Sequence, residues 1–150
     1  MRTVIQRVLS ASVAIGGKTK SAIGPGLLVL VGIGHKDDRE DIAYLVKKIA
    51  GLRIFDDEAG VMNRSILQTG GDIIVVSQFT LMAATKKGNR PAYVAAAGHE
   101  KAIPLYEGFC QALSEAIGKQ VGTGTFGADM QVSLINDGPV TICMDSKNKE

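Results

Sequence analysis

Segments with strand patterns outnumber helical segments along this chain by about eight to two. The two helices, expected at residues 37–50 and about 100–117, do not alternate with the strands as they would in a doubly wound fold. The order of segments therefore favours a β-rich α+β fold. We expect strands at residues 4–9, 12–15, 27–33, 52–55, 73–81, 121–125, 130–135 and 140–144.

Turn signals and apolar periodicity set the limits of these segments. Gly16-Gly17 predicts a two-residue hairpin, and the uninterrupted apolar run from Leu27 to Ile33 predicts a buried strand. The segments at 24–26 and 56–60 read as turns. One apolar stripe marks the first helix, formed by Ile42, Leu45, Val46 and Ile49, and a similar stripe marks the second, formed by Leu105, Phe109, Ala112, Leu113 and Ala116.

Helix ends are predicted from capping residues. Asp37 with Glu40 has capping-box spacing, and Gly51 suits the position just after the first helix. Pro104 should lie in the first turn of the second helix or kink it.

Length and composition narrow the function classes. A chain of 150 residues is expected to form a single domain, 1–150, with no apolar run near the ~20 residues needed to span a bilayer. The chain starts on a strand-like pattern without a signal-peptide core, so we expect a cytoplasmic protein. The net charge of +2 permits RNA binding without indicating it.

Cysteine and histidine are sparse. Cys110 and Cys143 are expected to be buried thiols, and His35 and His99 stand alone, so no metal or other cofactor is predicted. Neither histidine is near the motifs described next in sequence, although the fold could bring one closer.

Two short segments carry most of the functional information. Ser77-Gln78-Phe79-Thr80 follows the apolar run 73–76, and Asn136-Asp137-Gly138-Pro139-Val140-Thr141 lies near the C-terminus. Taken alone, the first is an amphipathic strand end with Phe79 in the core, and the second is a turn between two strands. Only about 5–6% of X-Pro bonds in folded proteins are cis.

Together these segments resemble the D-aminoacyl-tRNA deacylases, which free tRNA from D-amino acids. The resemblance extends through residues 6–8, 26–32, 52–55 and 88–91 and covers nearly the whole chain. It implies a barrel-like arrangement of sheets and a homodimer in which each Gly-Pro loop enters the partner's site. It implies that the protein binds the acceptor end of aminoacyl-tRNA. Neither a membrane nor DNA is expected as a partner.

The resemblance also implies roles for individual residues. The backbone amides of Phe79 and Thr80 would bind the ester carbonyl oxygen, and Ser77 and Gln78 would orient the terminal adenosine. A cis Gly138-Pro139 bond would present two carbonyl groups to the α-ammonium group of the substrate, so that an L side chain collides and a D side chain does not. Glycine has no side chain to reject, which extends the expected substrates to glycyl-tRNA mischarged on tRNA(Ala).

Other family positions match residues that also have an ordinary structural interpretation. Arg7 would hold the Gly-Pro loop, although it also reads as a surface strand arginine. Phe126, Gly127 and Met130 match as well, and Met130 would pack against the adenine or lie in the core. The charges of Lys86, Lys87 and Arg90 suit acceptor-end phosphates or a solvated loop.

Hydrolysis of an activated ester needs a placed water, oxyanion stabilisation and a base. Thr80 is a candidate nucleophile, but no adjacent base is evident. We therefore favour activation of the water by the ribose 2′-hydroxyl group and give Thr80 an orienting role. Three alternatives stay open: a sister tRNA-editing deacylase with a trans Gly-Pro bond and another chiral preference, a small-ester esterase using Thr80, and a non-enzymatic dimer that binds RNA ends.

Overall fold

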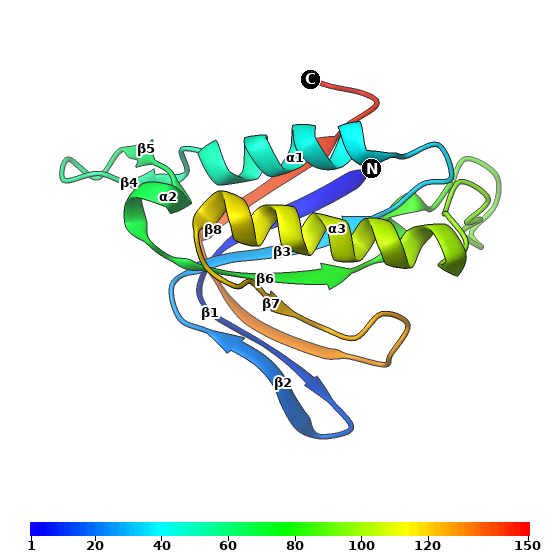
Figure 1. The fold of residues 1–150 in the computed structure, drawn as a ribbon, viewed down its shortest axis with the longest axis horizontal. Coiled ribbons are helices and arrows are strands. Elements are labelled where there is room, and N and C mark those ends of the chain that lie inside the picture. The colour runs from blue at the N-terminus through cyan, green and yellow to red at the C-terminus, as the bar shows by residue number, and fades with distance from the viewer.

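The computed structural model describes residues 1–150 as a curved β-sheet with helices on one side (Figure 1). Six strands form one sheet in the order β2-β1-β3-β6-β7, with β8 paired to β1, and β4 and β5 form a separate pair. The elements are β1 (Arg2–Ile15), β2 (Lys18–Ile23), β3 (Gly26–Gly32), α1 (Arg39–Gly51), β4 (Phe55–Asp56), β5 (Met62–Arg64), α2 (Ile66–Thr69), β6 (Asp72–Ser77), a 3₁₀ turn (Phe79–Met82), α3 (His99–Ile117), β7 (Gly122–Thr123) and β8 (Gln131–Asp145).

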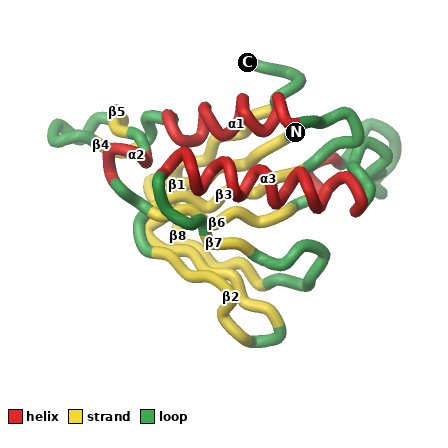
Figure 2. The backbone as a smooth tube through the Cα atoms, viewed as in Figure 1, coloured by secondary structure: helices red, strands yellow, loops and turns green.

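The parallel strands β3 and β6 are buried on both faces, which explains their continuous apolar sequences. Leu27, Val29 and Val31 face the larger core, which α1 and α3 cover. Leu28 faces a second core, closed by β2 and the first half of β8. Figure 2 shows the helices side by side over one face, with β1, β2 and β8 curling beneath the other. This curling produces the predicted barrel-like form.

Strands β1 and β8 run antiparallel along most of their length, but their register shifts twice near the middle. Gln6 pairs with Thr141 and Val8 with Asn136, so β8 advances five residues while β1 advances two. The three extra residues on β8 are Asp137, Gly138 and Pro139, and they form a bulge. Residues 136–139 therefore project from a continuous strand instead of joining two separate strands, as the sequence had suggested.

The predicted α+β class is confirmed, but the chain forms three helices where about two were expected, because α2 is an additional short one. The first helix is capped by Asp38 with Asp41, not by Asp37 with Glu40. The Asp37 carboxylate is already occupied, since it accepts from the Gly34 amide at 2.6 Å and pairs with the N-terminal ammonium group at 2.6 Å. Gly51 is the last helical residue, and Leu52 follows it in an extended conformation.

Several predicted boundaries also differ. The strand expected at 52–55 is shorter and shifted to Phe55–Asp56, so it extends into the predicted turn 56–60, and the one at 121–125 is reduced to Gly122–Thr123. Pro104 lies in the second turn of α3, beyond the expected first turn. Cys110 is buried as predicted, but Cys143 is exposed on β8. The Gly16-Gly17 hairpin is confirmed, with positive φ at both glycines. No helix is both long and apolar enough to cross a membrane.

Candidate active site

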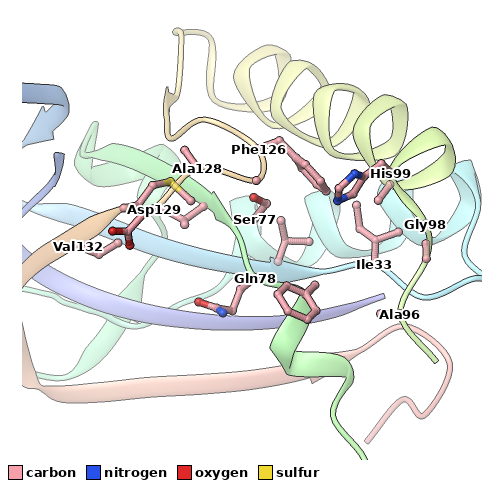
Figure 3. Close-up of a pocket in the computed structure, with 17 residues that line it drawn as sticks. Ile33, Ser77, Gln78, Ala96, Gly98, His99, Phe126, Ala128, Asp129 and Val132 are labelled. Carbon is pink, nitrogen blue, oxygen red and sulfur yellow. The ribbon is translucent and has the colours of Figure 1, made fainter. Parts of the chain in front are cut away.

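A largely apolar cavity lies where β3 and β6 end, beside the start of α3 and the segment 126–132 (Figure 3). It measures about 590 Å³, within the usual range for small-ligand sites. Most of its lining is apolar. The polar side chains around it are those of Ser77, Gln78, His99 and Asp129. The cavity can therefore hold a flat apolar group and offer it a few polar contacts.

Ser77-Gln78-Phe79-Thr80 forms a strand end followed at once by a 3₁₀ turn. The Gln78 amide donates to the Val31 carbonyl oxygen at 2.8 Å, and β6 pairs no further. The chain then folds over Gly32, where an added Cβ would lie 2.8 Å from the Leu81 Cβ. This close approach ends the strand at Ser77, whereas the sequence had predicted a strand to residue 81.

The turn leaves two backbone donors free, one on Phe79, which lines the cavity, and one on the adjacent Thr80. The Phe79 and Thr80 amides donate to no backbone acceptor, as expected for the first residues of a helical turn. Phe79 is 55% exposed and lines the cavity, so the alternative that placed it in the core is wrong. Two adjacent free amides are suitable donors for an oxyanion.

The Thr80 hydroxyl group is already engaged. It accepts a hydrogen bond from the Gln78 side-chain amide at 2.5 Å, and no histidine, carboxylate or lysine contacts it. Thr80 itself does not line the cavity. This arrangement suits a side chain that orients the turn better than one that attacks an ester.

Aromatic contacts stiffen both sides of the cavity. At one side the Phe79 and Tyr93 rings meet edge to face with centroids 4.9 Å apart. At the other, Phe126 lies between His99, at 5.6 Å, and Tyr106, at 5.9 Å. The Tyr106 hydroxyl group donates to the Val75 carbonyl oxygen at 2.8 Å, which fixes this row of rings to β6.

Burial shifts the acidity of two groups behind this wall. It raises the pKa of the Cys110 thiol to about 11, and it raises the pKa of the Tyr106 hydroxyl group well above its ordinary value. Both groups are therefore protonated at neutral pH. They belong to the packing of α3 against the sheet, and neither supplies a nucleophile to the cavity.

The bulge on β8 is held by the buried Arg7 side chain. Arg7 Nε donates to the Asp137 carbonyl oxygen at 3.2 Å and pairs with the Asp137 carboxylate at 3.0 Å. Its Nη1 donates to the Ile54 carbonyl oxygen at 2.7 Å and to Asp56 Oδ1 at 3.2 Å. The surface-strand reading of Arg7 is therefore wrong, since the side chain is only 8% exposed.

Gly138 and Pro139 are exposed at the tip of the bulge, and the peptide bond between them is cis, as the family resemblance implies. Gly138 has a φ of +119°, and a Cβ there would lie 3.0 Å from both Arg7 Nη2 and Val140 Cγ2. The Asn136 side chain closes the bulge by accepting from the Val140 amide at 2.9 Å. Glycine is thus required at 138 by backbone conformation and by space.

The structure brings together only some of the residues predicted to form the site. Five of them line the cavity: Ser77, Gln78, Phe79, Phe126 and Met130. Gly127 lines it too. Arg7, Gly138 and Pro139 do not, and neither do the basic residues Lys86, Lys87 and Arg90. Those three lie in an exposed loop closed by paired hydrogen bonds between Ala84 and Ala92.

Sequence reasoning missed two polar side chains that line the cavity, His99 and Asp129. His99 is 22 residues beyond Ser77 by number, and only the packing of α3 places it at the cavity. Its sequence signal was weak, because an isolated histidine at a helix start has many ordinary explanations. No group of three or more His, Cys, Asp or Glu side chains is arranged to hold a metal ion.

Comparisons with known proteins agree with this architecture. The family model described as D-Tyr-tRNA(Tyr) deacylase matches residues 4–145. Over all 150 residues of both chains, the sequence is 67% identical to a D-aminoacyl-tRNA deacylase of Bacteroides thetaiotaomicron and 59% identical to one of Porphyromonas gingivalis.

Two solved structures are similar as well. One, described as c-Myc DNA Unwinding Element Binding Protein, has a TM-score of 0.92 and 41% identity, covering 97% of this chain and 98% of that one. A probable eukaryotic D-amino acid tRNA deacylase has a TM-score of 0.81, with 95% and 97% coverage, and its 18% identity shows the fold alone. The chain belongs to the D-Tyr-tRNA(Tyr) deacylase family. It is therefore an enzyme, a hydrolase that acts on carboxylic ester bonds.

Proposed function

We propose that this chain hydrolyses the ester bond of D-aminoacyl-tRNA and releases tRNA and the free D-amino acid. The observation that carries the proposal is the pair of free amides at Phe79 and Thr80, at the edge of an apolar cavity in a member of this family. Such donors stabilise the negative charge that develops on the carbonyl oxygen of the ester during hydrolysis.

The terminal adenosine occupies the cavity in this proposal. Phe126 and Met130 supply apolar surface for the base, and Ser77 and Gln78 orient the nucleoside. The ester carbonyl oxygen then lies at the Phe79 and Thr80 amides. No side chain is assigned as the base, so the ribose 2′-hydroxyl group of the substrate activates the attacking water.

A second copy of the chain completes the site. Arg7 pairs with Leu27, Leu27 pairs with Ile73, and Ser77 follows Ile73 by four residues on β6. The bulge is therefore displaced from the cavity by roughly 13 Å along the strands and about 14 Å across them. A single substrate cannot bridge that separation within one chain, but a dimer could bring the partner's bulge to the cavity. The exposed side chains of Leu9 and Ile135, which flank the bulge, offer apolar surface for such a contact.

The bulge selects the chirality of the substrate. The carbonyl groups of Gly138 and Pro139 accept hydrogen bonds from the α-ammonium group, while the amides at Phe79 and Thr80 hold the ester oxygen. When the α-ammonium group and the ester oxygen are both fixed, the side chain of the amino acid can point in only one open direction. That direction is available to a D-amino acid. The site thus acts by rejecting L side chains, and glycyl-tRNA is also hydrolysed because it has nothing to reject.

The loop at 84–92 contacts phosphates of the acceptor end. Lys86, Lys87 and Arg90 lie at its exposed tip, and the Ala84–Ala92 pairing holds its base. Because the site has few cations, the loop neutralises a small number of phosphates. The affinity of the protein for tRNA should therefore depend only weakly on salt concentration.

The direct test compares matched substrates with the purified protein in metal-free buffer. D-tyrosyl-tRNA and glycyl-tRNA should be hydrolysed, while L-tyrosyl-tRNA and a free D-tyrosine ester should persist. Hydrolysis of the free ester at a similar rate would favour a small-ester esterase. Binding of the tRNA without any hydrolysis would favour a non-enzymatic RNA-end-binding dimer, and preference for an L substrate would favour the sister deacylase.

Mixed dimers test whether the site is shared between subunits. Phe79→Pro removes a donor from the cavity, and Gly138→Ala disturbs the bulge. Re-pairing equal amounts of the two inactive variants should restore about a quarter of the wild-type activity per chain, since about half of the dimers are mixed and each has one intact site. Each variant re-paired with itself is the control. If the mixture stays inactive while forming dimers, each cavity does not use the partner's bulge.

A further inference from the structure

We propose that His99 binds the nucleobase of the terminal nucleotide and so positions the substrate for hydrolysis. This inference rests on the proposed function, because it assigns a contact within that site. His99 is the first residue of α3, its side chain is exposed, and it lines the cavity. Figure 3 shows its ring beside Phe126, on the opposite side of Ser77 from Asp129.

The ring of His99 is held in place but its nitrogens are unused. It meets Phe126 edge to face, with 89° between the ring planes, and Phe126 is backed by Tyr106. The other histidine, His35, directs Nδ1 toward the Ala95 carbonyl oxygen at 3.1 Å, whereas the ring nitrogens of His99 make no hydrogen bond within the chain. An oriented ring with two free nitrogens in a cavity is available for a ligand.

The other polar side chains around the cavity do not fill this role. Gln78 already donates to Thr80, and Ser77 lies at the strand end next to the free amides. Asp129 can only accept when ionised, and it lies on the far side of Ser77. His99 alone stands on the aromatic side, next to the ring against which a base would pack.

The chemistry of imidazole matches the edge of a purine. In its neutral form one ring nitrogen donates and the other accepts. Adenine presents an acceptor nitrogen beside an amino donor. Phe126 contributes a ring surface for stacking, and His99 contributes the directional contact that fixes the base, and through it the ester, relative to the amides of Phe79 and Thr80.

The test uses His99→Ala and His99→Gln in the full chain, with His35→Ala as the control for loss of an imidazole outside the cavity. For D-tyrosyl-tRNA, His99→Ala should raise KM about tenfold with little change in kcat, as expected when one hydrogen bond and one aromatic interaction are removed. His99→Gln retains a donor and an acceptor, so it should recover part of the loss. A kcat reduced at saturating substrate with KM unchanged would overturn the proposal, because that result would assign His99 to the chemical step.

A binding measurement separates this inference from the proposed function. The probes are two non-hydrolysable conjugates in which D-tyrosine is amide-linked to the 3′ carbon of adenosine or of a ribose without a base. His99→Ala should weaken calorimetric binding of the adenosine conjugate about tenfold and leave binding of the base-free conjugate unchanged. If His99→Ala weakens binding of both conjugates equally, or weakens binding of neither, the assignment is overturned. If wild-type protein binds the adenosine conjugate through His99 yet hydrolyses no D-aminoacyl-tRNA, the proposed function fails while the base contact stands.

Discussion

The cavity and the β8 bulge are built in opposite ways. Around the cavity the polar groups are free, since the Phe79 and Thr80 amides and the His99 ring have no partners within the chain. At the base of the bulge Arg7 pairs with the carbonyl and carboxylate groups of Asp137, and the Asn136 side chain accepts from the Val140 amide. The cavity keeps these donors for a ligand, and the bulge uses the side chains of Arg7 and Asn136 to hold a fixed shape at its base. This contrast suits a binding cavity and a rigid projection that meets it from outside.

The sharpest test of the cavity removes the Phe79 ring in two variants, one that loses the backbone amide as well and one that keeps it. Phe79→Pro deletes the N–H group at a position where proline is tolerated, because it starts a helical turn. We expect kcat to fall by roughly 10²–10³-fold, the usual effect of losing one oxyanion donor. Phe79→Ala, which keeps the amide and removes the ring, is the matched control and should retain most activity. Equal losses in both variants would mean that the ring, and not the amide, matters.

The matching test of the bulge removes Arg7. Arg7→Met preserves the apolar stem but leaves the Asp137 and Ile54 carbonyl oxygens without their donor. Breaking a buried ion pair lowers the free energy of unfolding by about 3–5 kcal/mol. Because Asp56 and Asp137 are partly exposed, we expect a loss of about 3 kcal/mol for this variant. Urea unfolding should show this loss of stability. The ratio of D- to L-tyrosyl-tRNA hydrolysis rates should fall, because the bulge no longer excludes L side chains as well. Arg53→Met, which changes an exposed arginine bonded to Asn63, should alter neither quantity.

Features that depend on local sequence could be predicted, whereas features that depend on a distant partner could not. Strands β3 and β6 were predictable because burial on both faces produces unbroken apolar runs. The bulge was not, because Gly138-Pro139 has a turn-like sequence and only the cross-strand partner Arg7 keeps β8 continuous around it. The cap of α1 moved by one residue because Asp37 is engaged by Gly34, an interaction that depends on the fold.

The two motif segments were predictable as a site only through resemblance, since each alone fits an ordinary strand end or turn. His99 lay outside both segments. Its place at the cavity depends on the packing of α3 against β6 through Tyr106, which spans 31 residues of sequence. Local patterns carry no information about such a contact. Residues that reach a site from a distant helix are therefore those that sequence reasoning is most prone to miss.

The basic loop at residues 84–92, which does not line the cavity, provides a smaller test. Lys86→Ala with Lys87→Ala should weaken tRNA binding and reduce the slope of log K against log salt by up to about 0.9 for each duplex phosphate that the protein no longer neutralises. The preference for D over L substrates should stay the same, because these residues do not line the cavity. Lys47→Ala with Lys48→Ala, on the exposed side of α1, is a control of equal charge change. An unchanged salt slope would mean that the loop is only solvated.

Distant from both regions, Asp41 gives a prediction about pH. Burial alone would raise its pKa, but hydrogen bonds from Lys147, Ser146 and the Asp38 amide outweigh burial and lower the pKa to about 2. A lowered carboxylate pKa stabilises the folded state above the unfolded value near 3.9, and that stability is lost as pH falls toward 2. Asp41→Asn should therefore cost about 2–2.5 kcal/mol at pH 7 and almost nothing at pH 2. A stability difference that is independent of pH would contradict this assignment, and activity at pH 7 should be unaffected.

The smallest expected effect concerns Thr80, and it decides between two chemistries. Its hydroxyl group is held by the Gln78 amide and has no base beside it. Thr80→Ala should therefore retain most single-turnover activity on D-tyrosyl-tRNA, whereas replacing the 2′-hydroxyl group of the terminal ribose with hydrogen, on a 3′ ester, should abolish hydrolysis. Thr80→Ser retains the hydroxyl group and serves as the control. If Thr80→Ala binds tRNA normally, is folded and yet is inactive, the hydroxyl group takes part in the reaction and activation by the substrate is wrong. If it is active while the 2′-deoxy substrate is inert, the base lies in the tRNA itself, and the protein contributes the amides and the bulge that hold it in place.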